Sequence, residues 1–240
     1  GYPSIREAGT RLRTAWLSDY VERLLGVDAR EGGGRLDPLR LAAVLRLIAA
    51  NQSGELVKAR IAQEAALSAA SVTGYLDALD RLYLTEDLHP WAVNLTAREI
   101  GRRKVRVGDS GLAAWLCGAS VGLLKDVVRG GKVFGALLEG FVIGELSAQA
   151  GWAEVDYRLY HYRDRRGLEV DVIIELGDGR VIAVEVKSAA GLTGRHFAGL
   201  TDLKRKLGDR LAAGVVLAPV DEPMRYAEGL WGLPLNTLWE

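Results

Sequence analysis

Apolar residues recur at helical spacing along the first part of the chain. Between residues 10 and 27 they fall every three or four positions, which predicts an amphipathic helix. Residues 30–37 contain three consecutive glycines and predict a flexible connector. We therefore expect residues 1–37 to form one helix and a linker.

Three further helical patterns and one alternating segment follow this connector. The first begins at Pro38, a residue that suits the first turn of a helix, and the second covers residues 56–66. Ser68 can accept a hydrogen bond at the start of the third helix. Residues 84–93 alternate and contain a proline, which is typical of a short β-wing. Three helices and a wing form the winged-helix arrangement, so we predict a winged-helix segment at residues 38–125.

The last part of the chain combines helical and alternating patterns, and residues 126–240 are predicted to form an α/β (mixed) domain. Turn-forming sequences at 164–167 and 177–179 predict hairpins between its first three strands. The predicted elements are a strongly apolar helix at 132–150, strands at 158–163, 169–175 and 180–187, a polar helix at about 195–208 and a buried strand at 214–217.

Two carboxylates and a lysine fall on adjacent predicted strands. Glu185 and Lys187 are two residues apart, so both side chains leave the same face of their strand. Asp171 opens the preceding strand, and antiparallel pairing can bring its carboxylate close to that of Glu185. Converging carboxylates suit a hard cation such as Mg²⁺ or Mn²⁺, so we predict that these two bind the metal. We expect Lys187 to position water or offset charge, although such a Glu-x-Lys pair is also frequent on solvated edge strands.

Glu139 stands in an apolar part of the predicted helix at 132–150. A carboxylate between Leu138 and Phe141 requires a reason, because charged residues are seldom placed in apolar surroundings. We predict that Glu139 faces the sheet as a further catalytic carboxylate, and the alternative is an exposed position on a polar stripe. Glu145 lies about 240° further round the helix and therefore on a different face.

A basic segment is the candidate for contact with nucleic acid. Lys and Arg total 31 residues, equal to the 31 Asp and Glu, so attraction to a polyanion must come from a local patch. The third predicted helix exposes no Lys or Arg, which argues against simple DNA recognition there. We predict sequence-independent phosphate contact by the basic segment, with a solvated wing tip as the alternative. Its cations are Arg98, Arg102, Arg103, Lys104 and Arg106.

The cysteine and methionine content and the length of the apolar runs indicate the cellular compartment and the origin of the chain. The single cysteine, Cys117, excludes an internal disulfide, and no apolar run is long enough to span a membrane, so we expect a cytoplasmic protein without a membrane partner. The only methionine is Met224, which we interpret as a sign that the chain is a processed product or a piece of something longer.

The order and spacing of several short motifs resemble a known family over essentially the whole chain. The chain is similar to the C-terminal part of AAA-type ATPases that end in domain of unknown function 4143. The matching stretches are Gly1-Tyr2-Pro3, residues 16–20, residues 75–79, residues 109–113, residues 138–142, Tyr162-Arg163, residues 169–171 and residues 184–187. The chain departs from the family at Gly140, where an asparagine is usual, and at Lys104-Val105, where a Pro-Lys pair is usual.

The resemblance implies a fold, a partner module and an activity. It implies a winged helix followed by a restriction-endonuclease-like domain of the PD-(D/E)xK type, with Asp171, Glu185 and Lys187 as the motif. It also implies an N-terminal AAA-type ATPase module, which this chain lacks because it has no P-loop sequence. Two functions stay open: a metal-dependent nuclease associated with DNA, and an inactive nuclease fold that serves as a scaffold for partners, DNA or a second copy of the chain.

Overall fold

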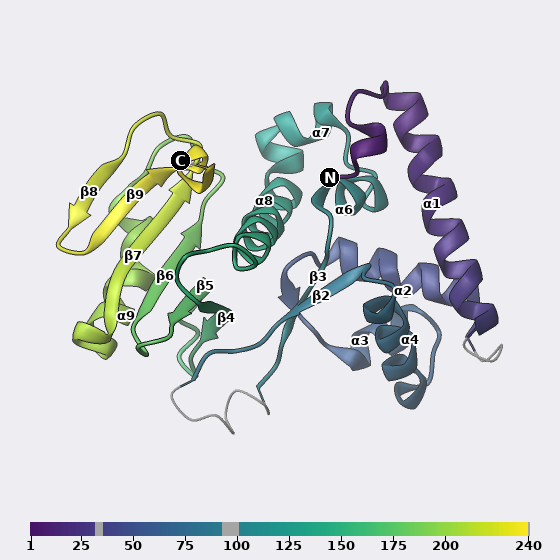
Figure 1. Cartoon of the computed structure of the whole chain (residues 1–240), viewed down its shortest axis with the longest axis horizontal. Coiled ribbons are helices and arrows are strands. Elements are labelled where there is room, and N and C mark those ends of the chain that lie inside the picture. Colours follow the sequence, from purple (N-terminus) through teal and green to yellow (C-terminus); the bar gives the residue numbers. More distant parts are fainter. Residues whose placement is uncertain (32–35, 93–100, 240) are drawn as a thin grey trace. The chain divides into compact units, whose positions relative to one another are not determined.

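A computed structural model describes residues 1–31, 36–92 and 101–239 of the chain (Figure 1). The described chain divides into two compact units. The first consists of Gly1–Asp87 and Val105–Gly140, and the second of Leu88–Lys104 and Phe141–Glu240. The second unit therefore takes in a segment that interrupts the first in sequence, whereas the sequence pattern placed a single boundary near residue 126. Fold class is as predicted: mixed α/β, with helices in the first half and a sheet in the second.

The first unit is built mainly from helices with a small sheet. Its sheet has the strand order β1-β3-β2, so helices α2, α3 and α4 followed by two strands give the predicted winged-helix arrangement. The elements are η1 (Pro3–Ile5), α1 (Thr10–Glu31), α2 (Pro38–Ala50), β1 (Gly54–Glu55), α3 (Lys58–Glu64), α4 (Ala69–Arg81), β2 (Thr85–Leu88), β3 (Lys104–Val107), α6 (Ser110–Leu116), α7 (Val121–Lys125) and α8 (Val127–Gln149). Leu88 at the end of β2, Lys104 at the start of β3 and the last part of α8, from Phe141, belong to the second unit.

Capping residues fix where several of these helices begin. The Ser68 side chain accepts a hydrogen bond from the backbone N–H of Ser71, as predicted, and Asp37 accepts one from Leu39 just before Pro38. These bonds satisfy N–H groups that have no partner within the helix. Asp109 caps α6 in the same way.

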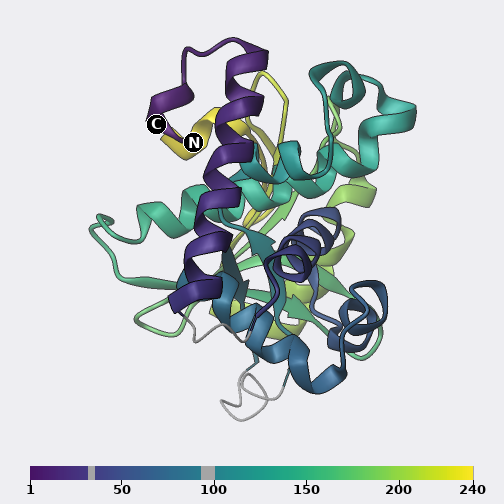
Figure 2. The ribbon, with the colours of Figure 1, turned by 90° about the vertical axis from the view of Figure 1, so that its right-hand side faces the viewer.

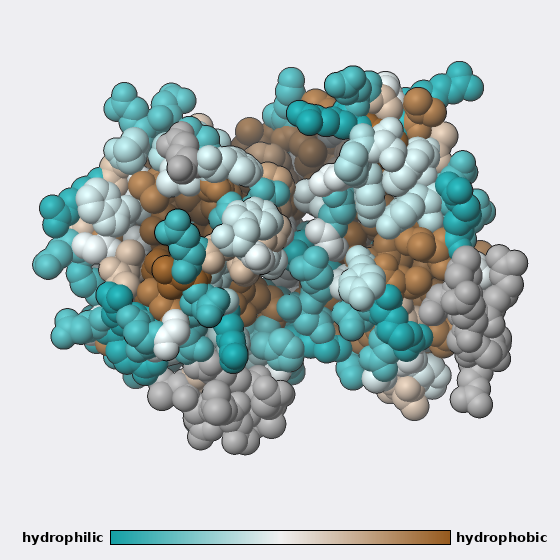
Figure 3. All heavy atoms as spheres, in the orientation of Figure 1, coloured by the Kyte–Doolittle hydropathy of each residue, from teal (hydrophilic) through white to brown (hydrophobic). Residues whose placement is uncertain are grey.

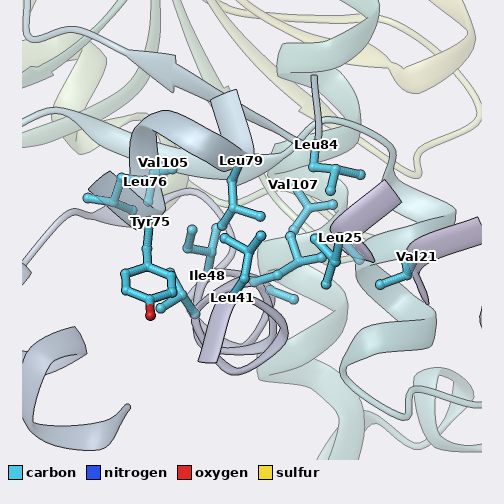
Figure 4. Packing of buried hydrophobic residues seen from close by; sticks show 14 of the residues in the cluster. Val21, Leu25, Leu41, Ile48, Tyr75, Leu76, Leu79, Leu84, Val105 and Val107 are labelled. Atoms are coloured by element: carbon cyan, nitrogen blue, oxygen red, sulfur yellow. The ribbon is translucent and has the colours of Figure 1, made fainter. Parts of the chain in front are cut away.

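The core of the first unit lies between α1, α2, α4 and β3. Leu41 and Ile48 from α2 meet Leu79 from α4 and Val107 from β3, and all four are essentially inaccessible to solvent (Figure 4). Figure 2 shows α1 as one long helix with the N-terminal turn folded back beside it, where Tyr2 packs against Trp16. Apolar side chains at helical spacing therefore assemble this unit, as the sequence pattern indicates.

The second unit contains a six-stranded mixed sheet with the order β4-β5-β6-β7-β9-β8. Strands β4, β5 and β6 are antiparallel, β7 runs parallel to β6, and β9 runs parallel to β7. The elements are β4 (Tyr157–Arg163), β5 (Glu169–Leu176), β6 (Val181–Val186), η2 (Gly194–Phe197), α9 (Ala198–Leu207), η3 (Gly208–Arg210), β7 (Leu211–Ala218), β8 (Met224–Ala227), β9 (Leu230–Pro234) and η4 (Leu235–Trp239).

The segment that leaves the small sheet after β2 belongs to the second unit. The His161 N–H donates to the His89 carbonyl at 2.9 Å, and the Trp91 N–H donates to the His161 carbonyl at 2.6 Å. The indole of Trp91 is buried against the sheet and donates to the Glu175 carboxylate at 2.9 Å. The far part of the predicted wing, up to Trp91, therefore lines the outer edge of β4 instead of extending freely.

Hydrophilic side chains cover much of the visible face of both units, with apolar areas between them (Figure 3). Among the described residues, no helix is both long enough and apolar enough to cross a membrane.

Candidate functional site

Asp171 and Glu185 lie side by side because of the register between β5 and β6. Val172 pairs with Val184 and Ile173 with Ala183, so extending this antiparallel register by one residue places Asp171 opposite Glu185. Both carboxyl groups share the face of the sheet on which Ile173 and Ala183 enter the core with α9. The structure thus brings together the two carboxylates that the sequence predicts as metal ligands.

Hydrogen bonds fix the orientation of this pair. One oxygen of Asp171, Oδ2, accepts from the backbone N–H of Val186 at 2.8 Å. The Lys187 ammonium donates to Oε2 of Glu185 at 2.7 Å. Lys187 therefore lies beside the carboxylates, as the Glu-x-Lys spacing predicts.

The Glu185 carboxyl is far less exposed than a solvated edge pair would be. Only 6% of the residue is accessible, and burial together with the nearby Asp171 raises its pKa to about 8, against the opposing effect of Lys187. At neutral pH the group is therefore largely protonated and can share its proton with Asp171. A strongly perturbed carboxyl beside a second carboxyl is typical of functional sites.

The beginning of α9 closes over the Glu185 carboxyl. A Cβ atom at Gly199 would lie 3.2 Å from Oε1 of Glu185 and 3.3 Å from the Glu169 carbonyl oxygen. Glycine therefore permits the close approach of the helix, and a larger residue would press on the carboxyl. Nothing in the sequence pattern distinguishes Gly199 as a site residue, because the contact depends on tertiary packing.

A buried lysine of β3, Lys104, also contacts the carboxylates of the site. The Nζ atom of Lys104 is 2.9 Å from Oε1 of Glu169 and 4.0 Å from Oδ1 of Asp171. Burial alone would raise the pKa of Glu169, but the Lys104 ammonium holds it below its ordinary value. The sequence pattern predicts phosphate contact for Lys104 and gives no signal for Glu169 as a site residue.

A β-bulge in β5 coincides with Asp171. Tyr160 pairs with Ile173 and Tyr162 with Val170, so His161 alone faces both Asp171 and Val172. An extra residue of this kind bends a strand and redirects side chains, and bulges are frequent beside active sites. His161 is 1% exposed, and its Nε2 lies 3.0 Å from the Arg102 carbonyl, which requires a proton on that nitrogen.

Glu139 lies on α8 within the first unit, whereas Asp171, Glu185 and Lys187 lie in the second. It is half-buried, and its convergence with the other three stays a prediction. Its competitor Glu145 accepts a hydrogen bond from the indole of Trp239 at 2.9 Å.

The predicted basic segment does not form one exposed surface. Arg98 lies outside the described residues, Arg102 is exposed and Arg103 is half-buried. Lys104 and Arg106 are only 3% and 4% exposed, and Arg106 is paired with Glu86. These two belong to β3, the middle strand of the small sheet, where carboxylates and not solvent surround the cations. The structure therefore departs from the predicted phosphate contact at both positions.

The donor set at the carboxylates fits a small hard cation. Mg²⁺ commonly takes one or two carboxylates from a protein and completes its octahedron with water and substrate oxygens. Asp171 and Glu185 supply that number. Within the described parts of the chain, no group of three or more His, Cys, Asp or Glu side chains is placed to hold a metal ion.

Comparison with known proteins matches the two parts of the chain separately. Domain of unknown function DUF8612 matches residues 1–122, and domain of unknown function DUF4143 matches residues 134–238. An uncharacterized protein of Mycobacterium tuberculosis and another of Mycobacterium bovis are each 27% identical over 205 residues. These matches cover 84% of this chain but 44% of each relative, so the chain spans less than half the length of those relatives.

No solved structure matches the chain with significance. The two matched ranges lie on either side of residue 126, the boundary that the sequence pattern suggests. The DUF8612 match covers half of the chain, and the DUF4143 match contains Asp171, Glu185 and Lys187. The chain belongs to the family defined by domain of unknown function DUF8612, and its C-terminal part carries a DUF4143 domain.

Proposed function

We propose that this chain is a nuclease-like, DNA-associated part of a larger protein, in which Asp171 and Glu185 bind Mg²⁺ or Mn²⁺ for phosphodiester hydrolysis. The observation that carries the proposal is the placement of two carboxyls opposite each other on β5 and β6 beside the Lys187 ammonium. When bound, the cation would polarise a phosphate and lower the pKa of a water.

The residues of the site have separate tasks in this proposal. Asp171 keeps one oxygen on the Val186 N–H, which leaves the other to face a cation. Glu185 must give up its proton before it can act as a second ligand, and the adjacent Lys187 favours that ionised form. Lys187 can then turn its ammonium from Glu185 to a phosphate oxygen, where it would stabilise the charge that develops during hydrolysis.

The test is cleavage of DNA by the protein in the presence of Mg²⁺ or Mn²⁺. We expect cutting that Lys187→Ala reduces by at least a hundredfold, a typical loss for one electrostatic catalytic group. Lys125→Ala is the matched control, because it removes the same charge from an exposed position on α7. Equal and negligible cutting by wild type and Lys187→Ala would contradict the proposed catalysis.

A specific observation also favours the second function, an inactive nuclease fold that serves as a scaffold. Lys187 and Lys104 already contact the carboxylates of the site, so the chain partly neutralises the charge that a metal would neutralise. This function requires no metal at Asp171 and Glu185. Calorimetric binding of Mn²⁺ that disappears in Asp171→Asn would exclude it in that form.

The partners are part of the same proposal. An AAA-type ATPase module follows from the family resemblance, and the relatives are long enough to contain further domains. DNA is proposed because a phosphodiester is the substrate that this carboxylate–lysine set suits. Among the residues predicted for DNA contact, Arg102 and Arg103 are the two that are described and not buried.

A further inference from the structure

The ammonium of Lys104 enters the acidic site from strand β3. It is 3% exposed, and a lysine so deeply buried requires a compensating negative charge. Glu169 supplies one carboxylate oxygen at 2.9 Å, and Asp171 presents another at 4.0 Å. The lysine therefore lies within ionic reach of a predicted metal ligand, although it is distant from that ligand in sequence.

The local geometry of β5 explains why one cation can serve two carboxylates. Glu169 and Asp171 are two residues apart, and the bulge beside His161 changes the direction of the strand at this point. Asp171 Oδ2 is held by the Val186 N–H, so the oxygen nearest to Lys104 is Oδ1. That is also the oxygen that is left to face a divalent cation.

The charges of the site are nearly balanced without a metal. Glu169, Asp171 and Glu185 provide three carboxyl groups, and Lys104 and Lys187 provide two ammonium groups within hydrogen-bond or ionic distance of them. A divalent cation at Asp171 would lie near the Lys104 ammonium and be repelled by it in a largely buried site, where charges are weakly screened.

We propose that Lys104 is a built-in counter-ion of the acidic site, coupled to Asp171 as well as to Glu169, and that it limits the affinity of Asp171 for a divalent cation. Lys104 is thus a positioning residue. The coupling part of this inference stands without the proposed nuclease function, and the affinity part rests on it.

The coupling part is tested by double-mutant cycles in urea unfolding of the whole chain. Lys104→Met, Asp171→Asn and the double variant form one cycle, and Lys104→Met with Glu169→Gln forms another. We expect the double variants to unfold with equilibrium constants about three- to tenfold below the product of the single effects. The control cycle pairs Lys104→Met with Asp178→Asn, whose partner is Arg180, and should be additive. Additivity between Lys104 and Asp171 would overturn the coupling.

The affinity part is tested by calorimetry with Mn²⁺. We expect Lys104→Met to bind Mn²⁺ about tenfold more tightly than wild type, because a repelling charge is removed while the length of the side chain is kept. Lys104→Arg should retain the wild-type affinity, which a purely structural role of the stem would not predict. Unchanged or weaker binding in Lys104→Met would overturn the competition.

Two further outcomes separate this inference from the proposed function. If neither wild type nor Lys104→Met binds Mn²⁺, metal binding and the competition are both wrong, and the counter-ion role is decided by the unfolding cycles. If Lys104→Met does not fold, Glu169→Gln replaces it. That variant frees Lys104 to approach Asp171 and should weaken Mn²⁺ binding about threefold, so unchanged or tighter binding would overturn the inference.

Discussion

Both units bury polar side chains, but they do so in opposite ways. In the first unit, Gln52 is 5% exposed, its Oε1 accepts from the Val107 N–H at 2.9 Å, and its Nε2 donates to the Val107 carbonyl at 3.1 Å. In the second unit, the carboxyls of Asp171 and Glu185 face each other and one of them has a strongly raised pKa. A buried amide that completes a backbone ladder stabilises a fold, whereas opposed carboxyls cost stability unless they are used.

The comparison predicts a large loss of stability when Gln52 is replaced by leucine. The substitution keeps the size of the side chain but leaves the N–H and the carbonyl of Val107 buried without these partners, which costs roughly 2–4 kcal/mol. The free energy of unfolding, measured in urea, should fall by that amount. In the second unit, Glu185→Gln should not lower it at pH 7, because folding of wild type must take up a proton there that the unfolded carboxylate has released, and glutamine removes this cost. Similar losses in both variants would remove the contrast.

The pH dependence of stability should come from the second unit. The folded pKa of Glu185 is about 8, above the ordinary value of 4.5, so the folded chain keeps a proton that the unfolded chain releases between these values. Stability should therefore decrease as pH rises through this window, by at most about 1.4 kcal/mol per pH unit, and level off above it. The measurement is urea unfolding from pH 5 to pH 9.

Glu185→Gln is the control for this pH dependence. Glutamine cannot ionise, so the variant should lose most of the decline that wild type shows between pH 5 and pH 8. If the free energy of unfolding falls equally with pH in wild type and in Glu185→Gln, another group titrates. The proposed contrast between the units would then be wrong.

Close packing around Gln52 predicts a smaller effect at Gly140. A Cβ at this position would lie 2.6 Å from Nε2 of Gln52, and two hydrogen bonds prevent that amide from moving freely. We expect Gly140→Ala to destabilise the chain by about 1–2 kcal/mol in urea unfolding. Gly131→Ala on the same helix is the matched control, since no heavy atom within 4 Å opposes its Cβ. It should be neutral or stabilising by up to about 1 kcal/mol, and equal destabilisation in the two variants would refute the packing argument.

The smallest effect is expected at an exposed ion pair. Arg180 and Asp178 are in contact at 2.7 Å in the turn between β5 and β6, and both side chains are about half exposed. Arg180→Ala should change the free energy of unfolding by less than about 0.5 kcal/mol, because solvent and salt screen such pairs. A larger fall in the free energy of unfolding would show that this exposed ion pair contributes as much to stability as the buried polar groups do.

The sequence pattern predicted the structure where residue type and spacing decide it. The cap at Ser68, the helix start at Pro38 and the strand that carries Glu185 and Lys187 follow from residue type and spacing. It missed β8, because all four of its residues are exposed and show no apolar alternation. It also missed β9, where a glycine and a proline weaken the strand pattern.

Part of the site could not be predicted for a different reason. Alternation with Val105 and Val107 places Lys104 and Arg106 on the face opposite to the core, which ordinarily means exposure. Their burial depends on carboxylates brought near by the fold: Glu169 for Lys104 and Glu86 for Arg106. Tertiary contacts of this kind leave no periodic signal in a single sequence.

The backbone hydrogen bonds of His89 and Trp91 with β4 determine at which border of the six-stranded sheet a further strand can pair. One border of the sheet is already occupied by this segment, which provides hydrogen-bond partners for both backbone groups of His161. At the other border of the described sheet, β8 is a short, exposed strand. Addition of a foreign strand, whether in assembly or in aggregation, is therefore directed to β8. Arg225, stacked on the indole of Trp231, places a positive charge on that border and discourages such addition.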